Sequence, residues 1–170
     1  MMFNKKIDDI SKIFYLFFLA AFFALSLAYI SEFVFGFKPC ILCLYQRKLF
    51  FILAAFSLAG VFLVKNKKWR KVILLISFSA LFLNIALAFY HSGVEMKFFK
   101  GLGECTSDFA KKIYSSIEEL EKDLLSEEIV RCDKPAFIFF GLSMASWNFI
   151  YSLSILIFAV GFLTKSNDKK

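Results

Sequence analysis

The sequence lacks the features that would mark a nucleotide-binding or multidomain protein. It has only seven glycines and two prolines in 170 residues. It contains no glycine-rich phosphate-binding loop, internal repeat, low-complexity tract or linker. The chain therefore predicts one domain, and its chemistry has to come from a small number of reactive side chains.

The composition indicates a membrane protein. Apolar residues make up 59% of the chain, and its 25 phenylalanines exceed what a soluble core of this length needs. The net charge of +7 could suggest nucleic acid as a partner. In a membrane chain it is better explained by basic residues that stay on the cytoplasmic side, so we expect no nucleic acid.

Four nearly uncharged runs predict four transmembrane helices, at about 13–31, 45–64, 72–90 and 136–163. Each is close to the length that crosses an apolar layer of ~30 Å. A cleaved signal peptide is the alternative for the first run. Its apolar core would have only about 7–15 residues, and no convincing small-residue cleavage site follows, so we predict an uncleaved span. The predicted fold is an all-α, integral membrane four-helix bundle.

Charge orients this bundle. The two termini and the short turn at 65–71 hold 11 of the 21 Lys and Arg residues and only three of the 14 acidic residues. Because basic segments stay inside, both termini are predicted to be cytoplasmic. The loops at about 32–44 and 91–135 then face outwards, which in a bacterium is the periplasm. All four cysteines lie in these loops or at their edges, on the oxidising side.

The second loop carries a predicted short amphipathic helix over 107–125. Apolar residues recur there at helical spacing: Phe109, Ile113, Ile117, Leu120 and Leu124. The segment is too polar to span a bilayer. It either lies along the membrane surface or packs on the loop itself.

A C-x-x-C motif is the strongest chemical signal. Pro39 suits the first position of a helix, which would put Cys40 in the first turn, where the helix terminus favours a thiolate. Arg47 follows Cys43 by one turn on the same face and could stabilise an anion at that sulfur. This arrangement is typical of a redox dithiol at a membrane edge.

The reactive residues also allow a metal site or structural bridges. Zinc could use Cys40, Cys43, Cys105 and Cys132, but the separation of the last two lacks the usual paired spacing, so we predict no metal. The cysteines could instead form purely structural disulfides, although these would not need the nearby cation. His91, the single histidine, is either an interfacial residue bonded to backbone or a hydrogen-bond donor to a quinone.

Several motifs together resemble the DsbB family, the bacterial inner-membrane disulfide-forming quinone reductases. They are the segments 39–47 and 90–95, the cysteines of the long loop, and the segments 131–133 and 141–148. The order and spacing agree from the first loop to the fourth span. One departure is Phe137 with its neighbour Ala136, where a tryptophan would be expected nearby.

The resemblance implies a protein-dithiol:quinone oxidoreductase, a monomer that binds ubiquinone or menaquinone near Arg47 and His91. Cys105 would form a mixed disulfide with a DsbA-like periplasmic thioredoxin-fold oxidase, and Cys132 would connect it to Cys40. Cys43 would meet the quinone. A vitamin K epoxide reductase-like enzyme is the closest alternative. In that class the loop pair precedes the C-x-x-C pair, whereas here it follows.

Overall fold

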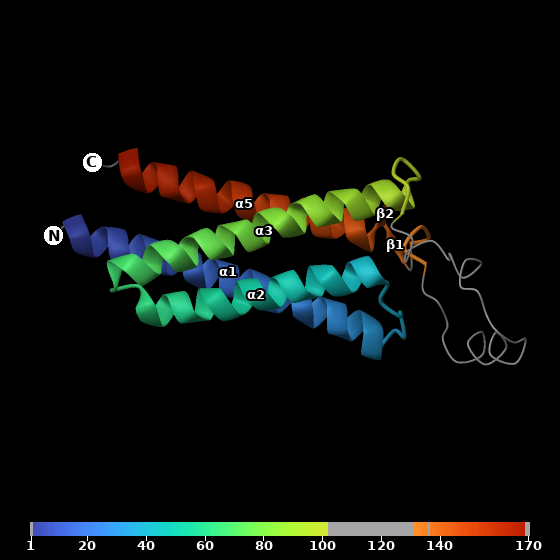
Figure 1. Cartoon of the computed structure of the whole chain (residues 1–170), viewed down its shortest axis with the longest axis horizontal. Coiled ribbons are helices and arrows are strands. Elements are labelled where there is room, and N and C mark those ends of the chain that lie inside the picture. The colour runs from blue at the N-terminus through green and yellow to red at the C-terminus, as the bar shows by residue number, and fades with distance from the viewer. Residues whose placement is uncertain (1, 102–130, 136, 169–170) are drawn as a thin grey trace, which may run out of the picture.

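Four long helices form an elongated bundle in the computed structural model, which describes residues 2–101, 131–135 and 137–168 (Figure 1). They are α1 (Met2–Phe33), α2 (Ile41–Leu63), α3 (Lys67–Glu95) and α5 (Met144–Asp168). Each contains a stretch long and apolar enough to cross a membrane. The predicted four-span bundle is confirmed.

Helices α1 and α3 extend at both ends beyond the apolar runs that predicted them. Hydropathy locates only the lipid-compatible part of a helix, whereas backbone hydrogen bonding continues into polar residues. In α3 the Asn66 side chain caps the amides of Lys68 and Trp69, so the helix begins five residues before the predicted position 72. At its other end α3 continues to Glu95, so His91 lies in a helix instead of the long loop.

The fourth span was predicted to begin at 136, which is wrong. A small antiparallel hairpin of β1 (Ile138–Phe139) and β2 (Leu142–Ser143) precedes α5. The two residues between the strands, Phe140 and Gly141, have φ values of 50° and 76°. Two left-handed residues suit a tight hairpin and are incompatible with a continuous right-handed helix.

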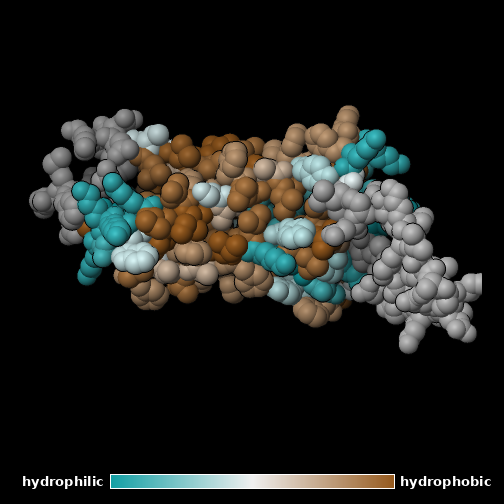
Figure 2. Space-filling view, in the orientation of Figure 1, coloured by the Kyte–Doolittle hydropathy of each residue, from teal (hydrophilic) through white to brown (hydrophobic). Residues whose placement is uncertain are grey.

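The core packs α1, α2, α3 and α5 through mostly aliphatic and phenylalanine side chains. Its fully buried members include Phe17 and Ala21 of α1, Leu53 of α2, Leu81 of α3 and Ala159 of α5. The outside of the same region is apolar as well, and Figure 2 shows it as a brown zone with teal residues at the two ends. An apolar exterior over an apolar core is what a bilayer as solvent requires.

The polypeptide runs back and forth along the bundle, so both termini and the α2–α3 turn lie at one end (Figure 1). The connection between α1 and α2 and the β1–β2 hairpin lie at the other end. Cys40, Cys43 and Cys132 therefore belong to the same end of the molecule. Cys105 and the amphipathic helix predicted at 107–125 lie outside the described residues.

Candidate redox site

The first cysteine of the C-x-x-C motif caps α2. Cys40 has an extended backbone (φ −74°, ψ 169°), and its sulfur accepts a hydrogen bond from the amide of Cys43 at 3.4 Å. A side chain caps this amide only from a non-helical residue in front of the helix. The predicted start at Pro39, with Cys40 in the first turn, is therefore wrong, and α2 begins at Ile41.

The two sulfur atoms of the motif face each other. Cys40 Sγ and Cys43 Sγ lie 2.9 Å apart, and both residues are thiols in this structure. Cys40 is buried, whereas Cys43 is half-buried. The pair is thus placed for disulfide formation, and Cys43 is the more exposed residue of the two.

Cys132 reaches this pair from the far part of the sequence. It is only 1% exposed and packs with Cys40, Leu42 and Val94 in one buried cluster. Its thiol is hydrogen-bonded to the sulfur of Cys40. Three of the four predicted catalytic cysteines therefore meet at one place, and a sulfur from the second loop directly contacts the helix pair.

The protonation of Cys40 differs from the sequence-based expectation. Its hydrogen bond with Cys132 lowers the pKa, but the hydrogen bond with Cys43, burial and the charge of Cys43 outweigh it and raise the pKa to about 12. The predicted preference for a thiolate at the helix terminus is not met, because the sulfur is buried against two other sulfurs. Cys40 is a thiol at neutral pH in the reduced site.

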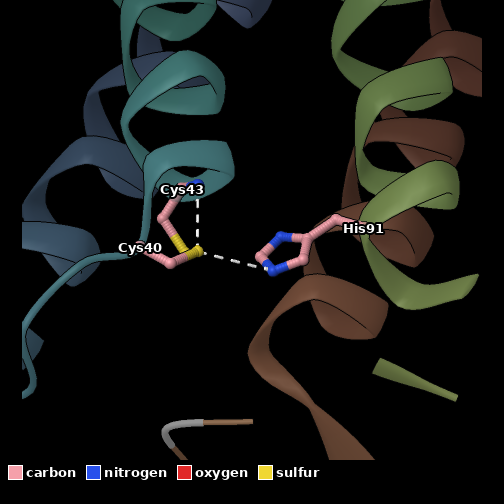
Figure 3. A group of neighbouring side chains, drawn as sticks. All are labelled: Cys40, Cys43 and His91. Atoms are coloured by element: carbon pink, nitrogen blue, oxygen red, sulfur yellow. Dashed lines mark hydrogen bonds between the residues drawn. The ribbon is translucent and has the colours of Figure 1, made fainter. Parts of the chain in front are cut away.

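His91 lies against the sulfur pair from α3 (Figure 3). Its Nε2 is 3.5 Å from Cys40 Sγ, its Nδ1 is 3.3 Å from Gln46 Nε2, and the side chain is 3% exposed. A carboxylate oxygen of Glu95 lies 3.7 Å from the same Nε2. The ring thus contacts side chains of the thiol site and is not an interfacial histidine at the lipid surface.

Comparison with known proteins agrees with this geometry. The family model described as "Disulfide bond formation protein DsbB" matches residues 11–162. The chain belongs to the DsbB family. It is also 32% identical over 146 residues to the uncharacterized protein RP370 of Rickettsia prowazekii, covering 85% of this chain and 83% of that protein. Identity to disulfide bond formation protein B of Xylella fastidiosa is 28% over 132 residues, 75% of each chain.

Family membership confirms the resemblance and defines the broad activity. The protein is a multi-pass inner-membrane protein of disulfide bond formation with an oxidoreductase role. Of the residues predicted to act in this DsbB-family chain, Cys40, Cys43, Cys132 and His91 lie together. Cys105 lies outside the described residues.

The contacts that the structure gives Arg47 are with α1. Its guanidinium pairs with the carboxylate of Glu32 and donates to the carbonyl of Ala28 at 3.0 Å. It also lies 5.1 Å from the centre of the Tyr29 ring. All three partners belong to α1. Arg47 was expected to serve as the counter-charge of Cys43, but its long side chain turns to an anion on the neighbouring helix.

The structure adds polar residues that the sequence analysis missed. Gln46 and Asn148 join α2 to α5 through a hydrogen bond of 2.9 Å, next to His91. Ser143 caps α5 and also donates to the Glu95 carboxylate. A sequence signal existed, because Gln46 and Asn148 are amides near the ends of apolar runs, where an uncharged polar group is costly unless it is paired.

Cys40, Cys43 and His91 also form a possible metal-binding group. Their sulfur and nitrogen atoms lie within 4.8 Å of one another, and such a donor set suits zinc. The hydrogen-bond pattern favours a different use of the ring. An amide nitrogen faces Nδ1, so the proton of a neutral ring belongs on Nε2, the atom a metal would need.

Proposed function

We propose that this protein re-oxidises a DsbA-like thioredoxin-fold oxidase in the periplasm and passes the electrons to ubiquinone or menaquinone. The observation that carries the proposal is the contact of Cys132 with the Cys40–Cys43 pair beside His91. A structural disulfide needs one partner for each cysteine. Three sulfurs in contact permit the disulfide to move from one pair to another.

The exchange begins in the long loop, with disulfides at Cys105–Cys132 and Cys40–Cys43. A partner thiolate attacks Cys105, and the bond to Cys132 breaks with its electron pair on Cys132. The Cys132 thiolate then attacks Cys40, and Cys43 leaves as a thiolate. Each step forms one S–S bond and breaks one, as thiol–disulfide exchange requires.

The second half of the exchange releases the partner. Its remaining thiolate attacks its own sulfur in the mixed disulfide, so the oxidised partner departs and Cys105 becomes a thiolate. Cys105 then attacks Cys132, and the Cys40–Cys132 bond breaks with its electron pair on Cys40. The loop disulfide is restored, and two electrons rest on the Cys40–Cys43 dithiol.

The surroundings of Cys43 suit a quinone, which combines an apolar ring with carbonyl oxygens. The side chains that pack on the sulfur cluster include Leu87 and Tyr90, and His91 offers a hydrogen-bond donor beside them. The quinone would supply the terminal oxidant, accepting two electrons and two protons from the dithiol. Arg47 would act at the edge of this site from its position beside α1.

The proposed orientation places the thiol end in the periplasm and both termini in the cytoplasm. The positive-inside bias supports it, and the observed sharing of one end by the termini and the basic α2–α3 turn is consistent with it. A membrane-impermeant thiol reagent tests it. After the disulfides are reduced with dithiothreitol, labelling of the cysteines in intact spheroplasts is expected, and labelling only after the membrane is opened would reverse the orientation.

The decisive experiment is quinone reduction by the purified protein with a reduced DsbA-like partner. We expect turnover by the wild type and by Ser154→Ala, which changes an exposed α5 residue whose hydroxyl donates to the carbonyl of Ile150. Turnover should be lost in Cys132→Ser, because the link from loop to helix pair is broken. Folded wild-type protein that reduces no quinone would contradict the proposal and favour structural disulfides instead.

A further inference from the structure

A chain of hydrogen bonds leads from the middle of the bundle towards the thiol site. Asn84 Nδ2 of α3 donates to Ser152 Oγ of α5 at 2.9 Å. Ser152 Oγ donates to Asn148 Oδ1 at 3.2 Å, and Asn148 Nδ2 donates to Gln46 Oε1 of α2 at 2.9 Å. In every link the donor lies on the side away from the sulfurs. The chain therefore has a direction.

The last links of the chain determine the state of the histidine. Because Gln46 uses its oxygen to accept from Asn148, its amide nitrogen faces His91 Nδ1. An amide nitrogen only donates, so Nδ1 has to accept, and the proton of the neutral ring lies on Nε2. Nε2 is the ring atom that faces the sulfur of Cys40.

Burial disfavours exchanging these hydrogen bonds for bonds to water. Asn84, Ser152, Gln46 and His91 are all buried, so water is a poor substitute for the partners they have. The opposite direction would require Gln46, Asn148 and Asn84 to turn together, because Ser152 Oγ would then accept from Asn148 and donate to Asn84. It would present an amide oxygen to Nδ1–H and leave Nε2 as an acceptor.

We propose that Gln46 and Asn148, supported by Ser152 and Asn84, are positioning residues that hold His91 in its Nε2–H tautomer, so that the ring donates to the sulfur of Cys40. The tautomer follows from the hydrogen bonds alone. Its use in catalysis rests on the proposed function.

The donor is needed when Cys40 is the leaving sulfur. In that step the Cys40–Cys132 bond breaks and its electron pair stays on Cys40, while a new bond joins Cys132 to Cys105. A thiol with a high pKa leaves slowly, and the pKa of Cys40 is high in the reduced site. A hydrogen bond from Nε2 stabilises the departing thiolate without adding a full charge to the apolar site.

Glu95 is the charged group that competes for the same proton. Its Oε1 lies 3.7 Å from Nε2, slightly farther than the sulfur, and its other oxygen accepts from Ser143. Within the described part of the chain, the thiols of Cys40 and Cys43 also lie near the ring, with Cys132 bonded to Cys40 behind them. The Ser143 bond holds part of the negative charge of Glu95 away from the ring, so the sulfur keeps its access to the donor.

The single histidine makes the tautomer directly measurable. Protein labelled with ¹⁵N-histidine gives one pair of ring signals, in which protonated and unprotonated nitrogens are distinct. In the reduced wild type we expect an unprotonated Nδ1 and a protonated Nε2. Gln46→Glu places an acceptor at Nδ1, and we expect Nδ1 to become protonated. Ser154→Ala changes an α5 residue outside the hydrogen-bond chain and should give the wild-type spectrum.

A second variant tests the hydrogen bond one link farther from His91. Asn148→Leu removes the donor to Gln46 Oε1, so the amide is free to turn, and both tautomers are expected. The step that expels Cys40 should also slow by about tenfold, which corresponds to one charge-assisted hydrogen bond. This step is followed in a Cys43→Ser, Cys105→Ser background, where the preformed Cys40–Cys132 disulfide has no other thiol to rearrange with, by reducing that disulfide with dithiothreitol.

The outcomes separate this inference from the proposed function. A protonated Nδ1 in the wild type would overturn the inference even if quinone reduction were complete. An unchanged tautomer in both Gln46→Glu and Asn148→Leu would do the same. If the tautomers behave as expected but no quinone is reduced, the hydrogen-bond chain stands and the proposed function fails.

Discussion

The two halves of the bundle are built from the same four helices but bury different kinds of side chain. Towards the termini, α1 meets α2 through Phe14, whose ring lies against Gly60, and the neighbouring buried residues are mostly apolar. At the thiol end, three sulfurs, a histidine and several amides are buried together. Polar groups are costly inside a membrane protein, so a cluster of reactive and hydrogen-bonded side chains at one end indicates function. The other half buries Ser57, Ser77 and Arg70 but no such cluster among the described residues, and we assign it to stability.

Removing a sulfur is expected to have the largest effect on activity. Cys40→Ser or Cys43→Ser should abolish quinone reduction, because neither variant can form the helix disulfide. The thermal unfolding midpoint of the reduced protein should stay close to that of the wild type, since the helices hold the bundle. Quinone reduction and the unfolding midpoint are measured on the same preparation. Near-wild-type quinone reduction by either variant would refute the redox assignment.

Cys40 should show an unusual pH dependence in the reduced protein. Its pKa is raised to about 12, so the thiolate fraction near neutral pH is on the order of a thousandfold below that of an ordinary thiol. Alkylation at Cys40, followed by mass spectrometry, should therefore keep rising with pH well above 9. Cys43→Ser removes two of the causes that raise the pKa, so the profile should move to lower pH.

The opposite shift is expected for Cys132→Ser. The hydrogen bond with Cys132 is the largest influence on Cys40 and lowers its pKa, so losing the bond should move the profile to higher pH. Hindered access of the reagent alone, with the pKa unchanged, would slow alkylation without moving the profile. Identical profiles in the wild type and both variants would show that the three sulfurs do not interact in solution.

The apolar half is probed at Gly60. An added Cβ would lie 2.6 Å from the Phe14 ring, which is too close for any carbon contact. Gly60→Ala should therefore lower the free energy of unfolding by about 1–3 kcal/mol through overpacking. Among the residues that the structure describes, Gly161 has open space around its Cβ position, so Gly161→Ala is the matched control.

The same pair of variants tests whether the apolar half affects the thiol site. Quinone reduction by folded Gly60→Ala should match that of the wild type at a temperature well below unfolding. A loss of activity without a loss of stability would mean that the apolar half also shapes the thiol site. Equal stability of the two alanine variants would mean that α1 and α2 do not approach closely at Gly60.

Sequence and structure agree where the signal is local. Hydropathy predicts the four spans, and the C-x-x-C motif predicts the sulfur pair of Cys40 and Cys43. The hairpin before α5 was missed because its phenylalanines continue an apolar run, and the positive φ of Phe140 has no marker in the residue type. A helix forecast from hydropathy alone passes through such a turn.

The parts of the site that depend on distant segments could not be predicted. The hydrogen bond between Asn148 and Gln46 spans 102 residues of sequence, and nothing in either neighbourhood identifies the other. The direction of a long side chain is equally hidden. Helical spacing placed Arg47 and Cys43 on one face, but the guanidinium pairs with Glu32 of α1, and electrostatics decided which way it turns.

The smallest expected effect concerns Arg47, near the start of α2. Arg47→Ala removes the pair with Glu32 and the bond to Ala28, so α1 loses a tie to the first turns of α2. If the charge also serves the quinone, KM for quinone should rise several-fold, and Arg47→Lys should rescue it in part because it keeps the charge but loses the planar fork. Glu32→Gln is the matched control, since it breaks the same ion pair and keeps the cation. An equal rise of KM in Arg47→Ala and Glu32→Gln would make the ion pair to α1 responsible. A rise in Arg47→Ala alone would assign the effect to the guanidinium.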